Sequence, residues 1–566
     1  MQAQLFNIHL NNPLMLDILC YIIMILYVCK RTPKYISKAT IAKLLLRIPK
    51  INQVFRQKIK SITYSMETPQ YFFTKIPENS LGAAKCFEIV CSYSQTIKSN
   101  LKSTLHSGTI YVNVNETAED YKYLPQTIEG VYMYIMQQSY YWNNMHDVEF
   151  RPTYSIQRQL GWMVADLLGG CTKPFTCMHT TGGTQSIMTA ARSYMNFGQK
   201  VKGLDREDVT IIALDTVHAS LIKARDAYGF NLVLIPTVAG TVMQKDIRKT
   251  IEAEKSNLVA IFCSYPAYVY GRVDDIGLFS KLALEYDIGL HIDCCLGGFL
   301  FNQLDNYIAA IMETPGLTSL SIDPHKNGLA PKGSSLLYCL DINDKSLAYY
   351  SIYAIPNWKG GLYGSIKDEG SASFVEVFCT YITILFYGKL YYRDVALKIT
   401  DTCKKIIDDI QSHCYHIVNH NPLNVICFKL HPTNNNVSYH FASQMEKLGI
   451  KFSILTDGYI QFCITPTFIS KDSNINKFLT SFSNTINNMG EVDSTNKSVR
   501  LYSSVDIALN PSTDSYVEYM QNILFGKLGI EESIRNHFVA LLNLEHEEKK
   551  KEEIKDVVEI KDVVEI

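Results

Sequence analysis

The sequence predicts an α/β protein with a mostly parallel sheet between helices, and two observations carry this prediction. Between about residues 160 and 340, short apolar runs alternate with amphipathic helical segments, a pattern typical of strands joined through helices. The runs are VTIIALD (209–215), NLVLIPT (231–237), LVAIFCSY (258–265), IGLHID (288–293) and SSLLYCL (334–340). Further along, helical segments at 391–412 precede the strands NVICFKL (424–430) and GYIQFCI (458–464), which predict a smaller α+β domain.

Composition excludes some classes of protein. The 566 residues are 47% hydrophobic and 19% charged, which suits two or three domains or one large domain with appendages. A net charge of -1 gives no field that would recruit nucleic acid, so no nucleic-acid partner is expected. The 15 cysteines form no CxxC pair or metal-ligand spacing, which favours a reduced, cytosol-facing body without a metal site.

The N-terminal region contains one apolar segment. Residues 18–29 (ILCYIIMILYVC) are uninterruptedly apolar, and 13–16 extend the run if Asp17 is tolerated. Basic residues follow this run and none precedes it, which predicts a single membrane span with the rest of the chain in the cytosol. The short run suits a thin bilayer such as the endoplasmic reticulum. A signal peptide would carry its charge before the apolar core, and a buried core helix remains the alternative.

Motifs beside the predicted strands carry the candidate chemistry. TTGGTQS (180–186) opens an amphipathic helix, where free backbone N–H groups form an anion site, although Thr184 is also an ordinary helix cap. Lys326, in SIDPHKNGLAPKGSS (321–335), lies in a polar loop where a lysine can condense with an aldehyde, and Lys332 is a second candidate.

Two further residues complete the pattern. Asp293 ends the run IGLHID, where a carboxylate can pair with a pyridinium nitrogen, and His218 in DTVHAS can stack on a cofactor ring. Taken alone, Asp293 is more simply explained as a helix cap, and His218 as a surface histidine. Their order along the chain (anion loop, histidine, aspartate, lysine) indicates a site for pyridoxal 5'-phosphate.

Several longer stretches support the same interpretation. They are SGTIY (107–111), TTGGTQSI (180–187), VHASLIKARDAYGF (217–230), LHIDCCLGGF (290–299), HKNGLAPKGSSLLY (325–338) and KGGLYGS (359–365). These stretches resemble the sphingosine-1-phosphate lyases, a membrane-anchored branch of the group II pyridoxal-phosphate-dependent decarboxylase superfamily. The likeness extends over roughly residues 15–490, and HIDCCLGGF with HKNGLAPKGSS is specific for the lyase branch.

The resemblance implies a pyridoxal-phosphate-dependent transferase type I fold. This fold has a large, mostly parallel seven-stranded sheet flanked by helices, with a smaller C-terminal α+β domain and, here, an N-terminal membrane-anchor helix. The expected parts are a membrane anchor with a basic juxtamembrane helix (1–60), a segment wrapping the dimer (61–150), the large cofactor-binding domain (151–390), the small domain (391–545) and a charged repeat tail (546–566). A homodimer in the endoplasmic reticulum membrane, with its catalytic domain facing the cytosol, is also implied.

The resemblance also assigns roles to residues. Lys326 forms the Schiff base, Asp293 pairs with the pyridine nitrogen and His218 stacks on the ring. The residues expected to hold the cofactor are Gly183, Thr184, His218, Asp293, His325 and Lys326. Those expected near the substrate are Tyr111, Tyr270, Asn144, His146 and Lys332.

The implied reaction is retro-aldol cleavage of a phosphorylated long-chain base, such as sphingosine 1-phosphate, to a fatty aldehyde and phosphoethanolamine. A tyrosine or Lys326 serves as the base. Three departures stand against the family pattern: Gln185 replaces a glutamate, Pro324 replaces a threonine, and 370–374 lacks an arginine, with Ala372 and Phe374 in that loop. A divergent paralogue with weak or no activity and an amino-acid decarboxylase are therefore the alternatives.

Overall fold

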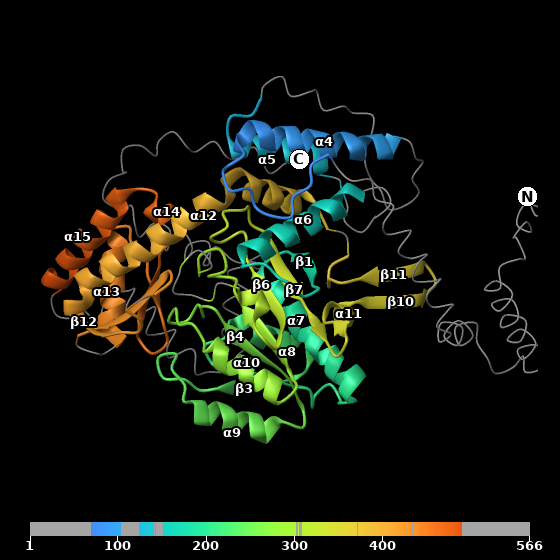
Figure 1. Cartoon of the computed structure of the whole chain (residues 1–566). Coiled ribbons are helices and arrows are strands. Elements are labelled where there is room, and N and C mark those ends of the chain that lie inside the picture. Colours follow the sequence, from blue (N-terminus) through green and yellow to red (C-terminus); the bar gives the residue numbers. More distant parts are fainter. Residues whose placement is uncertain are drawn as a thin grey trace, which may run out of the picture.

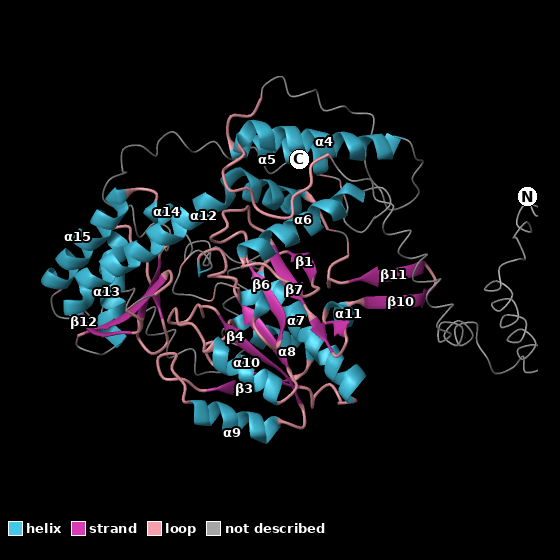
Figure 2. Cartoon of the chain, viewed as in Figure 1, coloured by secondary structure: helices cyan, strands magenta, loops and turns pink. Residues whose placement is uncertain are grey.

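The computed structural model describes residues 70–102, 124–140, 142, 151–301, 304, 308, 310–370, 372–420, 422–431 and 435–489. The predicted anchor at 18–29 and the tail at 546–566 lie outside these residues. Figures 1 and 2 show a large sheet with helices around it and a smaller sheet-and-helix unit beside it.

The large sheet has seven strands in the order β1-β7-β6-β5-β4-β2-β3. They are β1 (Thr176–Thr180), β2 (Thr210–Leu214), β3 (Asn231–Ile235), β4 (Leu258–Ser264), β5 (Gly289–Asp293), β6 (Leu317–Ile322) and β7 (Ser335–Cys339). The pairs β2–β3, β2–β4, β4–β5 and β5–β6 are parallel, and β7 runs antiparallel to both β6 and β1. The prediction of a mostly parallel seven-stranded sheet is confirmed.

The central strands are covered on both faces. In β2, Ile211 and Ala213 pack in one core cluster, while Ile212 and Leu214 pack in the other, because successive side chains of a strand point to opposite faces. Every residue of β2, β4, β5, β6 and β7 is buried. Burial on both faces explains why these strands read as continuous apolar runs rather than as alternating patterns.

Two strands were missed by the sequence analysis. β1 (TCMHT) and β6 (LTSLSI) are rich in threonine, serine and histidine. Their polar side chains are satisfied inside the core: Tyr194 Oη lies 2.6 Å from Thr318 Oγ1 and 2.8 Å from Ser319 Oγ. Because these polar residues are buried with partners that only the folded chain supplies, the sequences of β1 and β6 lack the apolar run that marks the other strands.

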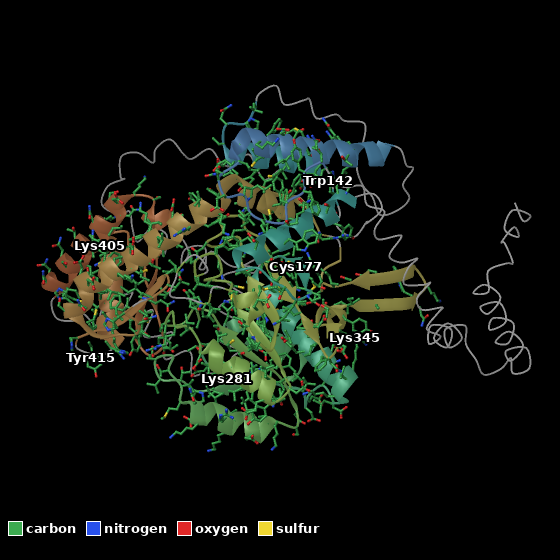
Figure 3. The ribbon with its side chains drawn as sticks, in the orientation of Figure 1. Trp142, Cys177, Lys281, Lys345, Lys405 and Tyr415 are labelled. Atoms are coloured by element: carbon green, nitrogen blue, oxygen red, sulfur yellow. The ribbon has the colours of Figure 1, made fainter. Side chains whose placement is uncertain are left out.

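Helices cover both faces of the sheet (Figure 1). On one face lie α7 (Gly183–Phe197) and α8 (Ala219–Tyr228); on the other lie α6 (Arg151–Leu167), α9 (Gln244–Glu254) and α10 (Ile276–Glu285). The helix α6 approaches β1 closely at Gly161, where an added Cβ atom would lie only 2.8 Å from the Cβ atom of Cys177. Cys177 is labelled in Figure 3.

A long helix, α12 (Val375–Ile410), runs from the large sheet to the smaller unit. Sequence analysis placed helical structure only from 391, so the helix begins earlier than predicted. It is kinked at Gly388, whose φ of 76° is left-handed and whose added Cβ would lie 2.6 Å from the carbonyl carbon of Asn79. At its start, Trp142, which is labelled in Figure 3, stacks on Phe374 and Phe378 with ring centroids 6.4 and 6.3 Å apart. The helices α4 (Gly82–Lys102) and α5 (Ile128–Ser139) also pack on α12.

The smaller unit is a four-stranded antiparallel sheet in the order β12-β13-β15-β14. Its elements are β12 (Cys414–Ile417), β13 (Val425–Leu430), α13 (Asn435–Lys447), β14 (Ser453–Ile454), β15 (Ile460–Cys463), α14 (Pro466–Ile469) and α15 (Asp472–Asn488). Two of these strands, β13 and β15, were predicted. Its core is aromatic, with Phe428, Phe441 and Phe482 in mutual contact at centroid distances of 5.2–6.5 Å.

The remaining elements are short. They are the π-helical turn η1 (Gly198–Lys202), the 3-10 turns η3 (Ile311–Glu313) and η4 (Gln411–His413), the pair β8 (Asp341–Ile342) and β9 (Lys345–Ser346), α11 (Ala348–Ser351), and the hairpin β10 (Tyr353–Trp358) with β11 (Gly361–Ser365). The hairpin extends away from the large sheet (Figure 1). Among the described residues, no helix has the length and apolar character needed to cross a bilayer.

The packing of α7 on the sheet predicts the effect of one substitution. A Cβ atom on Gly289 would lie 2.3 Å from Tyr194 Cε1, and the Tyr194 ring is fully buried and hydrogen-bonded. We expect Gly289→Ala to lower the free energy of unfolding by about 1–3 kcal/mol through overpacking, measured by urea unfolding followed by circular dichroism. Gly277→Ala, where the added atom meets only Asp275 Oδ1 at 3.5 Å, is the matched control. Equal stability of both variants would contradict this packing.

Candidate active site

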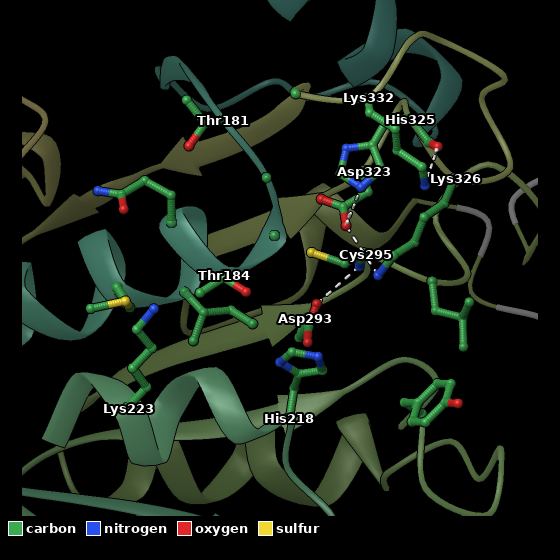
Figure 4. Close-up of a pocket in the computed structure, with 18 of the residues that line it drawn as sticks. Thr181, Thr184, His218, Lys223, Asp293, Cys295, Asp323, His325, Lys326 and Lys332 are labelled. Carbon is green, nitrogen blue, oxygen red and sulfur yellow. Dashed lines mark hydrogen bonds and ion pairs between the residues drawn. The ribbon is translucent and has the colours of Figure 1, made fainter. Parts of the chain in front are cut away.

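A cavity of about 580 Å³ opens beside α7 at the carboxyl ends of the parallel strands (Figure 4). Parallel α/β sheets bind ligands at this edge. The loops after β1, β2, β4, β5 and β6 all contribute to its lining. The lining includes Thr181, Gly182, Gly183, Thr184, Gln185, His218, Lys223, Tyr268, Asp293, Cys295, Asp323, His325, Lys326 and Lys332.

The N-terminus of α7 forms one end of the cavity. Gly182 is the N-cap and makes no side-chain capping bond, so the first backbone N–H groups of the helix are available to an anion. A Cβ atom on Gly183 would lie 2.7 Å from Asp323 Oδ2 and 3.0 Å from Cys295 Sγ. Glycine is therefore required here by the close approach of the two neighbouring loops, and the predicted residues Gly183 and Thr184 both line the cavity.

Lys326 lies at the centre of a charge cluster. Its Nζ is 3.1 Å from Asp323 Oδ2, and His325 Nε2 is 3.6 Å from the same oxygen (Figure 4). Burial by itself would lower the pKa of the Lys326 ammonium, but the carboxylates of Asp323 and Asp293 outweigh burial and raise this pKa above its usual value. The pKa of His325 is lowered, chiefly by burial. Without a bound aldehyde, Lys326 is therefore a protonated amine with a buried counter-ion.

Asp293 is an ionised carboxylate in the floor of the cavity. Its Oδ1 accepts hydrogen bonds from the backbone N–H of Cys295 at 2.9 Å and from Ser321 Oγ at 3.2 Å. Burial would raise its pKa, but the hydrogen bonds from Cys295 and the charge of Lys326 lower the pKa below its usual value. A buried carboxylate held in this form suits the charged nitrogen of a protonated pyridine ring.

A chain of buried polar groups supports Asp293 from behind. Ser321 Oγ lies 3.3 Å from His291 Nε2, and His291 Nδ1 lies 2.7 Å from Ser319 Oγ, which Tyr194 also reaches. Burial lowers the pKa of His291 to about 4, so this imidazole is neutral at physiological pH. The chain fixes the orientation of the carboxylate without adding a charge beside it.

The other predicted residues fall into three groups. His218 and Lys332 line the cavity, and Lys332 Nζ donates to the carbonyl oxygen of His325 at 3.4 Å. Tyr270 does not line it: its hydroxyl donates to Asp457 of the smaller unit, and its backbone N–H donates to Gln461 Oε1 at 3.0 Å. Its role near the substrate stays a prediction. Tyr111, Asn144 and His146 lie outside the described residues.

The three departures from the family pattern are placed differently. Gln185 lines the cavity and donates to Asp368 Oδ2 at 3.2 Å. Pro324 is absent from the lining, and its carbonyl accepts from the backbone N–H of Ala330 at 3.0 Å within the turn that carries Lys326. Phe374 is fully buried under Trp142.

Sequence reasoning missed Asp323 and Cys295. Asp323 has only 1% of its side chain exposed, and Cys295 is likewise buried. The spacing of Asp323 and Lys326 in one turn after β6 was an available signal, because residues three apart in a turn can meet. The close approach of Asp323 and Cys295 to Gly183 could not be predicted from the sequence, because the three residues lie in three separate loops.

Comparison with known proteins supports this interpretation of the site. A family profile described as the pyridoxal-dependent decarboxylase conserved domain matches residues 163–431. The sphingosine-1-phosphate lyase of Drosophila melanogaster is 29% identical over 335 residues, which cover 58% of this chain and 58% of the relative. The chain thus spans little more than half the length of that relative.

Solved structures share the fold. The sphingosine-1-phosphate lyase of Burkholderia pseudomallei superposes with a TM-score of 0.58 at 21% identity, covering 80% of this chain and 99% of that one. The glutamate decarboxylase of Lactobacillus brevis gives 0.55 at 15% identity, covering 76% and 97%. At these identities the likeness shows the fold alone. Over residues 163–431 the chain is therefore similar to the pyridoxal-dependent decarboxylases, and the cavity that brings Lys326 and Asp293 together lies within this segment.

Proposed function

We propose that this protein is a pyridoxal-phosphate-dependent carbon–carbon lyase that cleaves phosphorylated long-chain bases, such as sphingosine 1-phosphate, to a fatty aldehyde and phosphoethanolamine. The observation that carries the proposal is that Lys326, Asp293 and the uncapped N-terminus of α7 face one cavity. The names of the sequence relatives support a lyase over a decarboxylase.

The residues present fit the family's cofactor, pyridoxal 5'-phosphate. Asp323 Oδ1 is buried and has no hydrogen-bond partner among the described residues, as expected of a site that receives a further polar group. The free N–H groups of α7 suit the phosphate, Asp293 suits the pyridine nitrogen, and Lys326, which lines the same cavity, suits the aldehyde. When bound, this cofactor supplies an electron sink for the pair of electrons released by bond cleavage.

The protein's own groups then have separate tasks. Asp293, held by Cys295 and Ser321, keeps a proton on the ring nitrogen. Asp323 neutralises the ammonium of Lys326 whenever that amine is free. The exposed ammonium of Lys332 at the rim suits the phosphate of the substrate, which carries negative charge.

The membrane anchor, the homodimer and the endoplasmic reticulum location belong to the same proposal. The anchor is supported by the apolar run at 18–29 and the basic residues after it. A homodimer is supported by the exposed apolar side chains of the hairpin β10–β11, including Ile355 and Trp358. Cross-linking and membrane fractionation of the full chain test both.

The first prediction about this function concerns the choice between the two lysines. We expect the full chain to release a fatty aldehyde from sphingosine 1-phosphate, and Lys326→Ala to lower this rate by about a thousandfold or more. Borohydride should fix the cofactor to wild type and to Lys332→Ala, but not to Lys326→Ala, as measured by mass spectrometry of the intact protein.

Other outcomes of that assay identify the rival functions. Release of carbon dioxide from glutamate or an aromatic amino acid, without aldehyde, would establish a decarboxylase. Borohydride fixation at Lys326 without any turnover would establish a divergent, inactive paralogue.

The second prediction concerns Asp293. Asp293→Asn removes the charge that keeps the ring nitrogen protonated, and we expect kcat to fall by about 10²–10³-fold, as for the loss of one preorganised electrostatic group. Borohydride fixation at Lys326 should persist, because the lysine is intact. An unchanged kcat in Asp293→Asn would contradict the role of Asp293 as the partner of the ring nitrogen.

The third prediction concerns pH. Only the neutral amine of Lys326 attacks an aldehyde, so recapture of the cofactor by the cofactor-free protein accelerates as pH rises toward the raised pKa of Lys326. Asp323→Asn removes the largest influence raising this pKa and leaves burial, which lowers it. The rate profile should therefore move to lower pH, with recapture at fixed pH faster by about tenfold for each unit of pKa lost. Asp341→Asn, on the exposed side of β8, is the control; identical profiles for all three proteins would refute the role of Asp323.

A further inference from the structure

Two groups that can carry a positive charge approach Asp323 in the cavity. Asp323 Oδ2 lies 3.1 Å from Lys326 Nζ and 3.6 Å from His325 Nε2, so both groups face the same oxygen (Figure 4). The other oxygen, Oδ1, is buried and has no hydrogen-bond partner among the described residues. Because only 1% of the Asp323 side chain is exposed, its carboxylate needs a cation beside it at every stage of the reaction.

The orientation of His325 makes Nε2 the nitrogen that gains or loses a proton. His325 Nδ1 donates to the backbone carbonyl oxygen of Ser334. A carbonyl oxygen can only accept, so Nδ1 carries a hydrogen in both the neutral and the charged ring. Nε2, which faces Asp323, therefore presents a lone pair in the neutral ring and a proton in the imidazolium.

While Lys326 is an ammonium, His325 is neutral. Burial lowers the pKa of His325, the carboxylate of Asp323 raises it, and the charges of Lys332 and Lys326 lower it again, so that this pKa lies below its usual value. Lys326 then satisfies the carboxylate, and a second cation on the same oxygen would be repelled by the first. The charge of His325 therefore depends on the charge of Lys326.

Other charged or titratable groups surround this turn without pairing with Asp323. They are Asp293 and Cys295 in the cavity, His179 of β1, Lys367 and Glu369 of the loop after β11, and Glu376 of α12. Burial lowers the pKa of His179 to about 3, so that imidazole is neutral. Among the residues that the structure describes, only Lys326 and His325 lie within salt-bridge distance of Asp323.

Joining Lys326 to an aldehyde removes the ammonium from this pair. The ammonium first loses a proton, its nitrogen then forms a bond to the aldehyde carbon, and the aldehyde oxygen leaves as water with the two hydrogens that remain on the nitrogen. We infer that His325 Nε2 holds the proton that Lys326 loses, so that His325 replaces Lys326 as the counter-ion of Asp323. This inference rests on the proposed covalent role of Lys326.

The first test counts protons when the cofactor binds. Pyridoxal 5'-phosphate is titrated into the cofactor-free full chain by calorimetry, in buffers of different ionisation enthalpy. We expect wild type to retain about one proton per site that His325→Gln releases, because glutamine keeps a donor for Ser334 but has no group that titrates. Equal proton counts in the two proteins would overturn the inference.

Pyridoxine 5'-phosphate separates the effect of the aldehyde from that of the phosphate. This compound has the same ring and phosphate but an alcohol in place of the aldehyde, so Lys326 stays an ammonium. We expect it to give equal proton counts in wild type and His325→Gln. A difference between the two proteins with this compound would show that the proton on His325 follows the phosphate, and the inference would be wrong.

A second test removes the ammonium by substitution. In cofactor-free Lys326→Gln, we expect the pKa of His325 to exceed its value in cofactor-free wild type by about one pH unit or more, because Asp323 then acts on His325 alone. Nitrogen-15 NMR of the histidine rings measures this pKa, and the signal is assigned by its loss in His325→Gln. Adding Asp323→Asn to Lys326→Gln should abolish the rise. No rise in Lys326→Gln, or an equal rise in the double variant, contradicts the inference.

The inference and the proposed function fail separately. If borohydride does not fix the cofactor at Lys326, the proposed chemistry fails, while the Lys326→Gln comparison still decides whether His325 can replace the lysine beside Asp323. If borohydride fixes the cofactor at Lys326 but wild type and His325→Gln give equal proton counts, the covalent role of Lys326 stands and the inference about His325 is wrong.

Discussion

The site depends on one ion pair, between the half-buried ammonium of Lys326 and the fully buried carboxylate of Asp323. A lone carboxylate at the depth of Asp323 would cost several kcal/mol, and its pairing with Lys326 offsets most of that cost. The pair keeps the amine at the cavity centre, and it leaves Asp323 Oδ1 without a partner among the described residues. This arrangement is typical of a site that exchanges one polar partner for another during its work.

The two acidic residues of the cavity are kept apart by their surroundings. Asp293 is fixed by Cys295 and by Ser321, with the neutral His291 behind it. Among the residues that the structure describes, Asp323 lies within salt-bridge distance of Lys326 and His325. One carboxylate is therefore immobilised for a permanent partner, while the other can change partners. A difference of environment, rather than of residue type, separates their roles.

The sheet explains why these groups meet. Parallel strands end at the same edge, so the end of β5 and the loops after β2 and β6 bring Asp293, His218 and Lys326 to one cavity. The close approach of Gly183 to Asp323 and Cys295 then seats the N-terminus of α7 against the same loops. A side chain at position 183 would push the anion end away from the lysine.

The sequence by itself determined the mostly parallel sheet, five of its seven strands, and the identity of Lys326, Asp293, His218, Gly183 and Thr184 as cavity residues. These followed from apolar runs and from motifs confined to single loops. Only the tertiary structure decided the strands β1 and β6, whose polar residues find their partners across the core, and the position of Tyr270, which contacts Asp457. It alone also decided that Asp323 pairs with Lys326 and that both Asp323 and Cys295 lie close to Gly183. The physical reason is that a charge state and a hydrogen-bond direction depend on distances between groups, and a sequence fixes such distances only within a turn or a helix.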